Sequence, residues 1–104
     1  VRARYMYDLF GEATELIQSI DSDRPVAMAN GDLGYIDIIA EECKGLDVFG
    51  SNVYRGISAR DYFQVVKDKL GLPTMFTEFG ADAFNAITMK EDQETQAYFL
   101  LAMA

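Results

Sequence analysis

Residues 74–80, Thr-Met-Phe-Thr-Glu-Phe-Gly, are the stretch of sequence that decides the fold. The segment is short and largely apolar, and a Gly-Leu-Pro sequence directly before it closes the helix that precedes it. A short apolar run between turn signals is typical of a strand in a parallel sheet that is covered on its faces. Two similar runs lie upstream. We therefore expect parallel strands near residues 26–30, 47–53 and 74–79.

Helical periodicity separates these runs. Apolar residues recur at three- and four-residue steps in three segments, which predicts amphipathic helices over residues 6–20, 36–43 and 62–70. The last apolar segment, residues 97–104, predicts a fourth helix that continues to the end of the sequence. The expected order is therefore α-βα-βα-βα.

Polar residues mark the expected helix ends. Asp32 is the predicted N-cap of the second helix, and Gly45 its end. Ser58–Asp61 has the spacing of a capping box before the third helix. After a loop over residues 80–85, Thr88–Glu91 is a fuller capping box and is expected to start the final helix.

Alternating strands and helices predict an α/β fold with a parallel sheet and right-handed crossovers. The strands start near Val26, Asp47 and Thr74, a spacing that fits a (β/α)8 barrel, which spends about 31 residues per unit. The spacing also fits part of a doubly wound sheet, but no G-x-G-x-x-G follows any strand, so the dinucleotide-binding version has no support. We expect residues 1–104 to form a single partial TIM (β/α)8 barrel domain, truncated at both ends, with the remainder of the barrel on further sequence.

The composition argues against several classes of partner and site. With 17 acidic and 9 basic side chains, the net charge of −8 disfavours nucleic acid and anionic membranes as partners. No apolar run reaches the roughly 18 residues that a membrane span needs. The absence of histidine excludes Ser–His catalysis and histidine-containing metal sites. The single cysteine, Cys43, cannot form an internal disulfide and is expected to be a buried structural thiol. We expect no metal, no cofactor and a cytoplasmic location.

Polar residues at the carboxyl ends of the expected strands are the candidate site residues, because function gathers there in parallel α/β folds. Glu78 is the sharpest candidate, since a carboxylate is costly to bury and Glu is depleted in strands. It either acts chemically or simply reaches solvent or a neighbouring Arg. The long connection after it favours function. Asn30 ends the first strand, and Asn52 and Tyr54 end the second.

Together these segments resemble a known family. Thr77–Asp82 resembles the nucleophile segment of retaining β-glycosidases built on the (β/α)8 barrel, above all family 2 glycoside hydrolases, the β-galactosidase, β-glucuronidase and β-mannosidase group. Ser51–Tyr54 resembles the end of the sixth strand, where a Tyr commonly hydrogen-bonds the nucleophile. The resemblance implies that the chain covers about helix 4 to helix 7 of such a barrel. It also implies that Glu78 is the catalytic nucleophile and Tyr54 its catalytic partner.

The resemblance further implies a carbohydrate substrate held by Asn30, Asn52 and Asp82. These enzymes take the acid/base Glu from the end of the fourth strand, which would precede residue 1. Because retaining hydrolysis needs two carboxyl groups about 5–5.5 Å apart, we expect the fragment alone to be inactive. Asp82 is expected to be a supporting loop carboxylate or a helix cap rather than the missing acid.

Other interpretations of the same residues stay open. Asn30 and Asn52 can satisfy turn backbone, Tyr54 can be a half-buried strand aromatic, and Arg55 can contact sugar hydroxyls or be a solvated loop residue. At the level of function, the alternatives are a small self-standing α/β binding or interaction module without catalysis, and a barrel enzyme that uses Glu78 as a general base.

Overall fold

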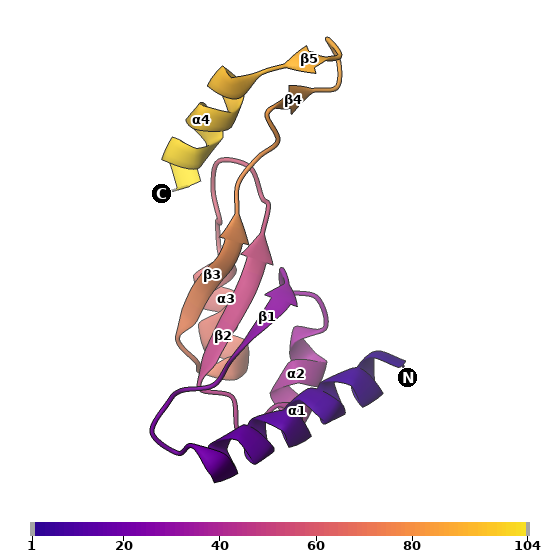
Figure 1. The fold of residues 1–104 in the computed structure, drawn as a ribbon, viewed down its shortest axis with the longest axis vertical. Coiled ribbons are helices and arrows are strands. Elements are labelled where there is room, and N and C mark those ends of the chain that lie inside the picture. Colours follow the sequence, from indigo (N-terminus) through magenta and orange to yellow (C-terminus); the bar gives the residue numbers. More distant parts are fainter. Residues whose placement is uncertain (1, 104) are drawn as a thin grey trace.

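The computed structural model describes residues 2–103 and contains four helices and five strands (Figure 1). In chain order these are α1 (Arg2–Ile20), β1 (Ala27–Gly31), α2 (Ile36–Glu42), β2 (Val48–Val53), α3 (Tyr62–Leu70), β3 (Thr74–Phe79), β4 (Phe84–Asn85), β5 (Lys90–Glu91) and α4 (Gln93–Met103).

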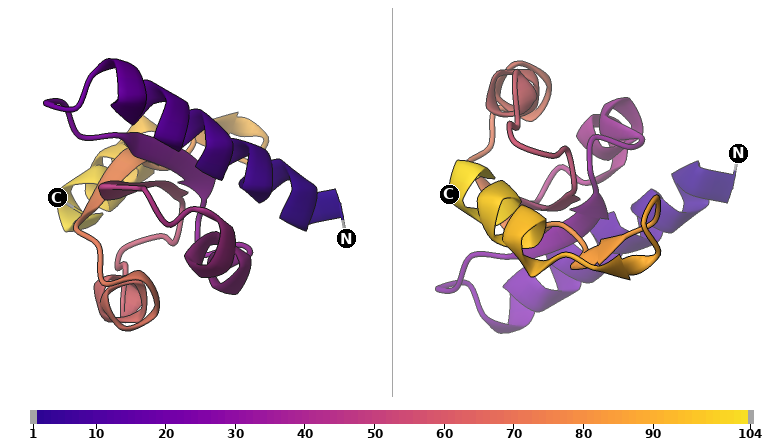
Figure 2. Two further views of the ribbon diagram at one scale, coloured as in Figure 1. Left: turned by 90° about the horizontal axis from the view of Figure 1, so that it is seen from below. Right: turned by 90° about the horizontal axis from the view of Figure 1, so that it is seen from above.

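The three longer strands form one sheet in the order β1-β2-β3, and both neighbouring pairs are parallel. Helices α2 and α3 connect these strands and lie together on one side of the sheet (Figure 2). The predicted α/β class and the three parallel strands are therefore confirmed. Three strands cannot close a barrel by themselves, so the barrel stays a prediction.

The core lies between the sheet and helices α2 and α3. Strand β2 turns Phe49 and Val53 toward these helices, and both side chains are fully buried with Tyr62 and Val66 of α3. Cys43 is also buried, as predicted, and its thiol lies 3.3 Å from the carbonyl oxygen of Tyr7, to which it donates. The buried thiol therefore has a structural role at the junction of α1 and α2.

Helix α1 packs on α2 through a narrow face. Its buried residues are Tyr7, Gly11 and Thr14, and not the apolar stripe that its periodicity marks. At Gly11 an added Cβ would lie 2.3 Å from the carbonyl oxygen of Glu42, so the missing side chain allows the two backbones to approach. The apolar stripe is mostly exposed and includes Met6, Leu9, Phe10, Leu16, Ile17 and Ile20.

The predicted start of the final helix is wrong. The Thr88–Glu91 segment contains β5, which pairs antiparallel with β4 inside the region expected to be a loop. The reason is local: the Asn85 side chain accepts hydrogen bonds from the backbone N–H groups of Ile87 and Thr88 and fixes a turn there. Helix α4 begins two residues later, where the Asp92 carboxylate accepts a bond from the Thr95 N–H.

Two other helix-start predictions are also wrong. Ser58 accepts a hydrogen bond from the Arg60 N–H, which makes a local turn, and the cap position of α3 is Asp61, whose side chain makes no capping bond. The cap position of α2 is Tyr35, which has left-handed backbone angles, and Asp32 lies outside the helix.

The end of α2 also differs from the prediction. The helix ends at Glu42 with Cys43 as its C-cap, so Gly45 lies beyond the helix rather than at its end. Gly45 instead presents its carbonyl oxygen to the Gln18 side chain of α1, 2.7 Å away.

The β4–β5 hairpin and α4 extend beyond the carboxyl ends of the sheet (Figure 1). The radius of gyration is 16.5 Å, against about 13 Å for a compact domain of this length. Helix α4 has no buried side chain, although its residues from Ala97 onward are apolar on all sides.

We expect Gly11→Ala to destabilise the fold by about 1–3 kcal/mol, because the new methyl group would overlap the Glu42 carbonyl. The intrinsic helix preference for Ala over Gly acts in the opposite direction. Urea unfolding followed by circular dichroism measures the difference. Gly31→Ala is the control, because a Cβ there meets nothing within 4 Å. A Gly11→Ala protein that is more stable than the wild type would contradict the close contact.

Candidate active site

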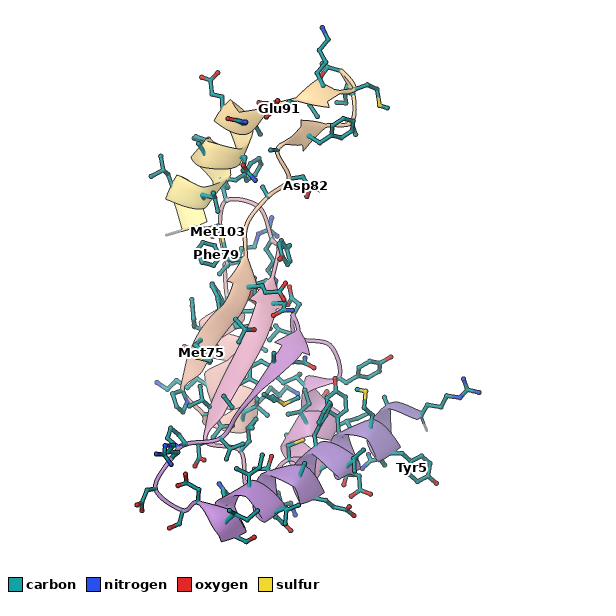
Figure 3. The ribbon with its side chains drawn as sticks, in the orientation of Figure 1. Tyr5, Met75, Phe79, Asp82, Glu91 and Met103 are labelled. Atoms are coloured by element: carbon teal, nitrogen blue, oxygen red, sulfur yellow. The ribbon has the colours of Figure 1, made fainter. Side chains whose placement is uncertain are left out.

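The carboxyl ends of β2 and β3 lie side by side and form the candidate site. Asn52 pairs with Glu78 and Val53 pairs with Phe79, so the ends of both strands reach the same edge of the sheet. The connection that carries Asp82 leaves this edge toward the hairpin (Figure 3). The structure thus brings together the ends of the two strands on which the resemblance depends.

A bulge in β3 decides which way Glu78 points. Ser51 pairs with Phe76 but the next residue, Asn52, pairs with Glu78, so Thr77 is an extra residue in β3. Regular alternation would place Glu78 on the same face as Phe76, which packs on the Tyr62 ring of α3 with 5.3 Å between centroids. The bulge instead places Glu78 on the face of Asn52, away from the helices.

The bulge is held by a side-chain hydrogen bond. The Thr77 hydroxyl donates to the Asn52 side-chain oxygen over 2.6 Å, which ties the extra residue to the neighbouring strand. After the bulge, Phe79 returns to the helix-covered face, where its ring lies 6.3 Å from that of Phe76. The bulge therefore leaves Thr77 and Glu78 together on the open face, whereas Phe76 and Phe79 both face the helices.

Tyr54 and Glu78 are in direct contact. The Tyr54 phenol donates a hydrogen bond of 2.9 Å to Oε2 of Glu78, as the resemblance implies. This bond is the main cause of a raised Tyr54 pKa, and the charge of Asp82 adds to it, since losing the phenolic proton beside carboxylates is unfavourable. Among the described residues, no hydrogen bond involves Oε1 of Glu78. One carboxylate oxygen is thus oriented and the other is available to a ligand.

Asn30 lies apart from this pair. It is buried on the helix-covered face, where its side-chain oxygen accepts a bond of 2.7 Å from the Tyr7 hydroxyl. Its amide group donates to the carbonyl oxygens of Asp32 and Gly34, each 3.0 Å away. These bonds occupy the amide inside the protein and favour its interpretation as a residue that satisfies turn backbone, rather than one that holds a sugar hydroxyl.

Sequence reasoning missed the ion pair between Asp32 and Arg55. Arg55 donates from Nε to Oδ2 of Asp32 over 2.8 Å and from Nη2 to Oδ1 over 2.5 Å. The guanidinium lowers the pKa of the Asp32 carboxyl, mainly through this hydrogen bonding. The expected solvated loop Arg is in fact only 27% exposed in its side chain. The signal was available: Asp32 directly follows β1 and Arg55 closely follows β2, so both belong to the same sheet edge.

The described part of the chain offers neither a metal-binding cluster nor a membrane-spanning helix. Residues 2–103 contain no group of three or more His, Cys, Asp or Glu side chains placed to hold a metal ion. None of the helices in this range is both long and apolar enough to cross a membrane.

Comparisons with protein-family models, with curated proteins and with solved structures find no match to this chain. The resemblance to family 2 glycoside hydrolases therefore stays a prediction.

We expect Glu78→Gln to lower the Tyr54 pKa toward the ordinary value for tyrosine, because the phenol would no longer donate to a charged oxygen. The measurement is an NMR titration of the protein labelled with ¹³C at the tyrosine Cζ atoms. Tyr54→Phe assigns the signal. Asp82→Asn is expected to lower the same pKa by a smaller amount. An unchanged titration of Tyr54 in Glu78→Gln would contradict the hydrogen bond.

The Asp32–Arg55 pair predicts a loss of stability in acid. Because the folded-state pKa of Asp32 lies below its unfolded value of about 3.9, the stabilisation is complete above that value and is lost as the pH falls through the folded pKa. We expect Asp32→Asn to cost roughly 1 kcal/mol or less at neutral pH, since solvent screens a partly exposed pair.

Urea unfolding between about pH 7 and pH 2, a range that spans both titrations, measures this dependence. The difference between wild type and Asp32→Asn should disappear at the acid end. Asp37→Asn, which removes the exposed Asp37–Lys69 pair, is the matched control and should change little. A difference that persists unchanged in acid would show that the charge of Asp32 is not its source.

Proposed function

We propose that this chain is the nucleophile-bearing part of a retaining β-glycosidase built on a (β/α)8 barrel. The observation that carries the proposal is the hydrogen bond from Tyr54 to Glu78 at the carboxyl ends of two adjacent parallel strands. In parallel α/β folds, catalytic groups gather at this edge. The bulge at Thr77 supports the proposal, because bulges that re-aim a side chain are over-represented beside active sites.

The proposed reaction begins with attack by Glu78. Its Oε1 forms a bond to the anomeric carbon while the bond from that carbon to the leaving oxygen breaks, which gives a covalent glycosyl-enzyme. A second carboxyl group protonates the leaving oxygen and then takes a proton from the water that releases the sugar. We propose that this group is a Glu at the end of the fourth barrel strand, on sequence before residue 1.

Tyr54 orients the nucleophile in this scheme. Its phenol fixes Oε2 of Glu78 and thereby directs Oε1 toward the sugar. An unperturbed tyrosine is already protonated through the neutral range, and the raised pKa of Tyr54 extends its role as a donor to higher pH. Tyr54 thus restricts the carboxylate to one orientation without itself exchanging a proton.

The proposed substrate is a carbohydrate, with Asn52 and Asp82 beside the reacting centre. The oxygen of the Asn52 amide accepts the bond from Thr77, while its NH₂ group has no partner among the described residues and faces the open side of the sheet with Glu78. An amide donor in this place suits a sugar hydroxyl.

Exposed apolar side chains favour the barrel over a self-standing module. Leu9 and Leu16 of α1 are each 61% exposed, and Ile20 is 79% exposed. Helix α4 adds Leu101 at 80%. Helix faces with so many exposed apolar side chains are rare on an independent soluble domain, and further barrel elements would cover them.

The proposal predicts covalent labelling of Glu78. We would treat the protein that contains these residues with dinitrophenyl fluoro-β-glycosides of galactose, glucose, mannose and glucuronic acid, in which fluorine replaces the hydroxyl beside the anomeric carbon. Dinitrophenolate leaves without protonation, so the first step does not need the acid/base residue. Mass spectrometry should find one fluoroglycosyl group on the peptide that carries Glu78.

Glu78→Gln should abolish the labelling, whereas Glu91→Gln, which changes an exposed carboxylate on β5, should leave it intact. An adduct on another residue, or none with any of the four sugars, would contradict the nucleophile assignment. An adduct on Glu78 would also exclude the alternative in which this residue is only a general base.

A further inference from the structure

Asp32 is bonded to the chain on both sides of Tyr54. Its backbone N–H donates to the carbonyl oxygen of Asn52 over 3.0 Å, and its own carbonyl oxygen accepts from the Ser51 hydroxyl over 3.0 Å. Beyond Tyr54, its carboxylate binds the guanidinium of Arg55. Tyr54 is therefore the exposed residue within a short segment that Asp32 holds at both ends.

Asp32 is itself firmly placed. Its φ of 50° lies in the left-handed region, where Asp and Asn are better tolerated than most residues. The buried Asn30 amide donates to its carbonyl oxygen, and the N–H of Leu33 donates to its Oδ1 over 2.7 Å. Asp32, which holds the Tyr54 segment, is thus itself held by the buried Asn30.

Arg55 is fixed on a second side. Its guanidinium carbon lies 5.3 Å from the centroid of the Tyr62 ring, and Tyr62 is fully buried. Nη1 also lies 3.9 Å from the Asp61 carboxylate. A planar guanidinium held by a carboxylate fork and an aromatic face has little freedom to rotate. The position of the residue directly after Tyr54 is therefore well determined.

We propose that Asp32 and Arg55 are positioning residues that hold Tyr54 where its phenol meets Glu78. Their catalytic meaning rests on the proposed function, but the geometric claim does not. Tyr54 needs such support because the residue is 61% exposed, so little packing around the ring orients it. If the pair only stabilised the loop after β1, its loss would leave the bond between Tyr54 and Glu78 unchanged.

The test uses the opposite signs of two effects of Arg55→Gln. Removing a nearby positive charge raises the pKa of a phenol, because the phenolate loses a favourable partner. Loss of the hydrogen bond to Glu78 lowers the Tyr54 pKa instead. A downward shift in Arg55→Gln therefore reports loss of positioning alone. We expect such a shift, smaller than the one that Glu78→Gln produces, in an NMR titration of tyrosine labelled with ¹³C at Cζ.

A double-mutant cycle separates positioning from remote effects. Once Glu78→Gln has removed the bond, adding Arg55→Gln should produce no further fall of the Tyr54 pKa. Lys69→Gln is the matched control, since it removes one cation from an exposed ion pair away from the site and should leave Tyr54 unchanged.

Arg55→Lys serves if Arg55→Gln does not fold, as judged by circular dichroism. The Lys variant keeps the charge and loses the two-point fork, so it should also lower the Tyr54 pKa. An unchanged or raised Tyr54 pKa in the folded variant would overturn the proposal. Labelling of Glu78 by a fluoroglycoside is measured separately, so failure of the positioning claim and failure of the proposed function can be told apart.

Discussion

The extra residue in β3 is the constraint on which the site depends. Thr77 diverts Glu78 from the helix-covered face to the open face, where it meets Tyr54. Gly50 of β2 makes room for the bulge: a Cβ there would lie 2.9 Å from the Thr77 methyl group and 2.2 Å from the carbonyl oxygen of Met28. The bulge at Thr77 therefore depends on the absence of a side chain at Gly50 in the neighbouring strand.

Two strands supply the groups that meet beside this bulge. The third strand supplies the carboxylate, and the second supplies the phenol that orients it. Asp32, in the loop after the first strand, fixes the chain on both sides of Tyr54. In the proposed function, the carboxylate on the third strand would therefore be oriented by groups on and after the other two strands, as expected where precise geometry must be held by residues outside the reacting centre.

The sequence predicted the sheet because buried parallel strands have a distinct pattern of short apolar runs between turn signals. It also predicted that Glu78 and Tyr54 would end neighbouring strands. The bulge was not predictable, because strict alternation places Phe76 and Phe79 on opposite faces of the sheet. Only the observed register shows that both face the helices. The Thr88–Glu91 capping box was outcompeted by the side chain of Asn85, a local contact that a spacing rule does not weigh.

The buried thiol has a practical consequence. Cys43 is the only cysteine and is 5% exposed at the junction of α1 and α2, so a bulky thiol reagent can reach it only after the surrounding elements open. The rate of its alkylation in the native protein therefore measures how often the structure around Cys43 opens. Cys43 is thus a natural reporter of local unfolding on the helix-covered side of the sheet, opposite Glu78 and Tyr54.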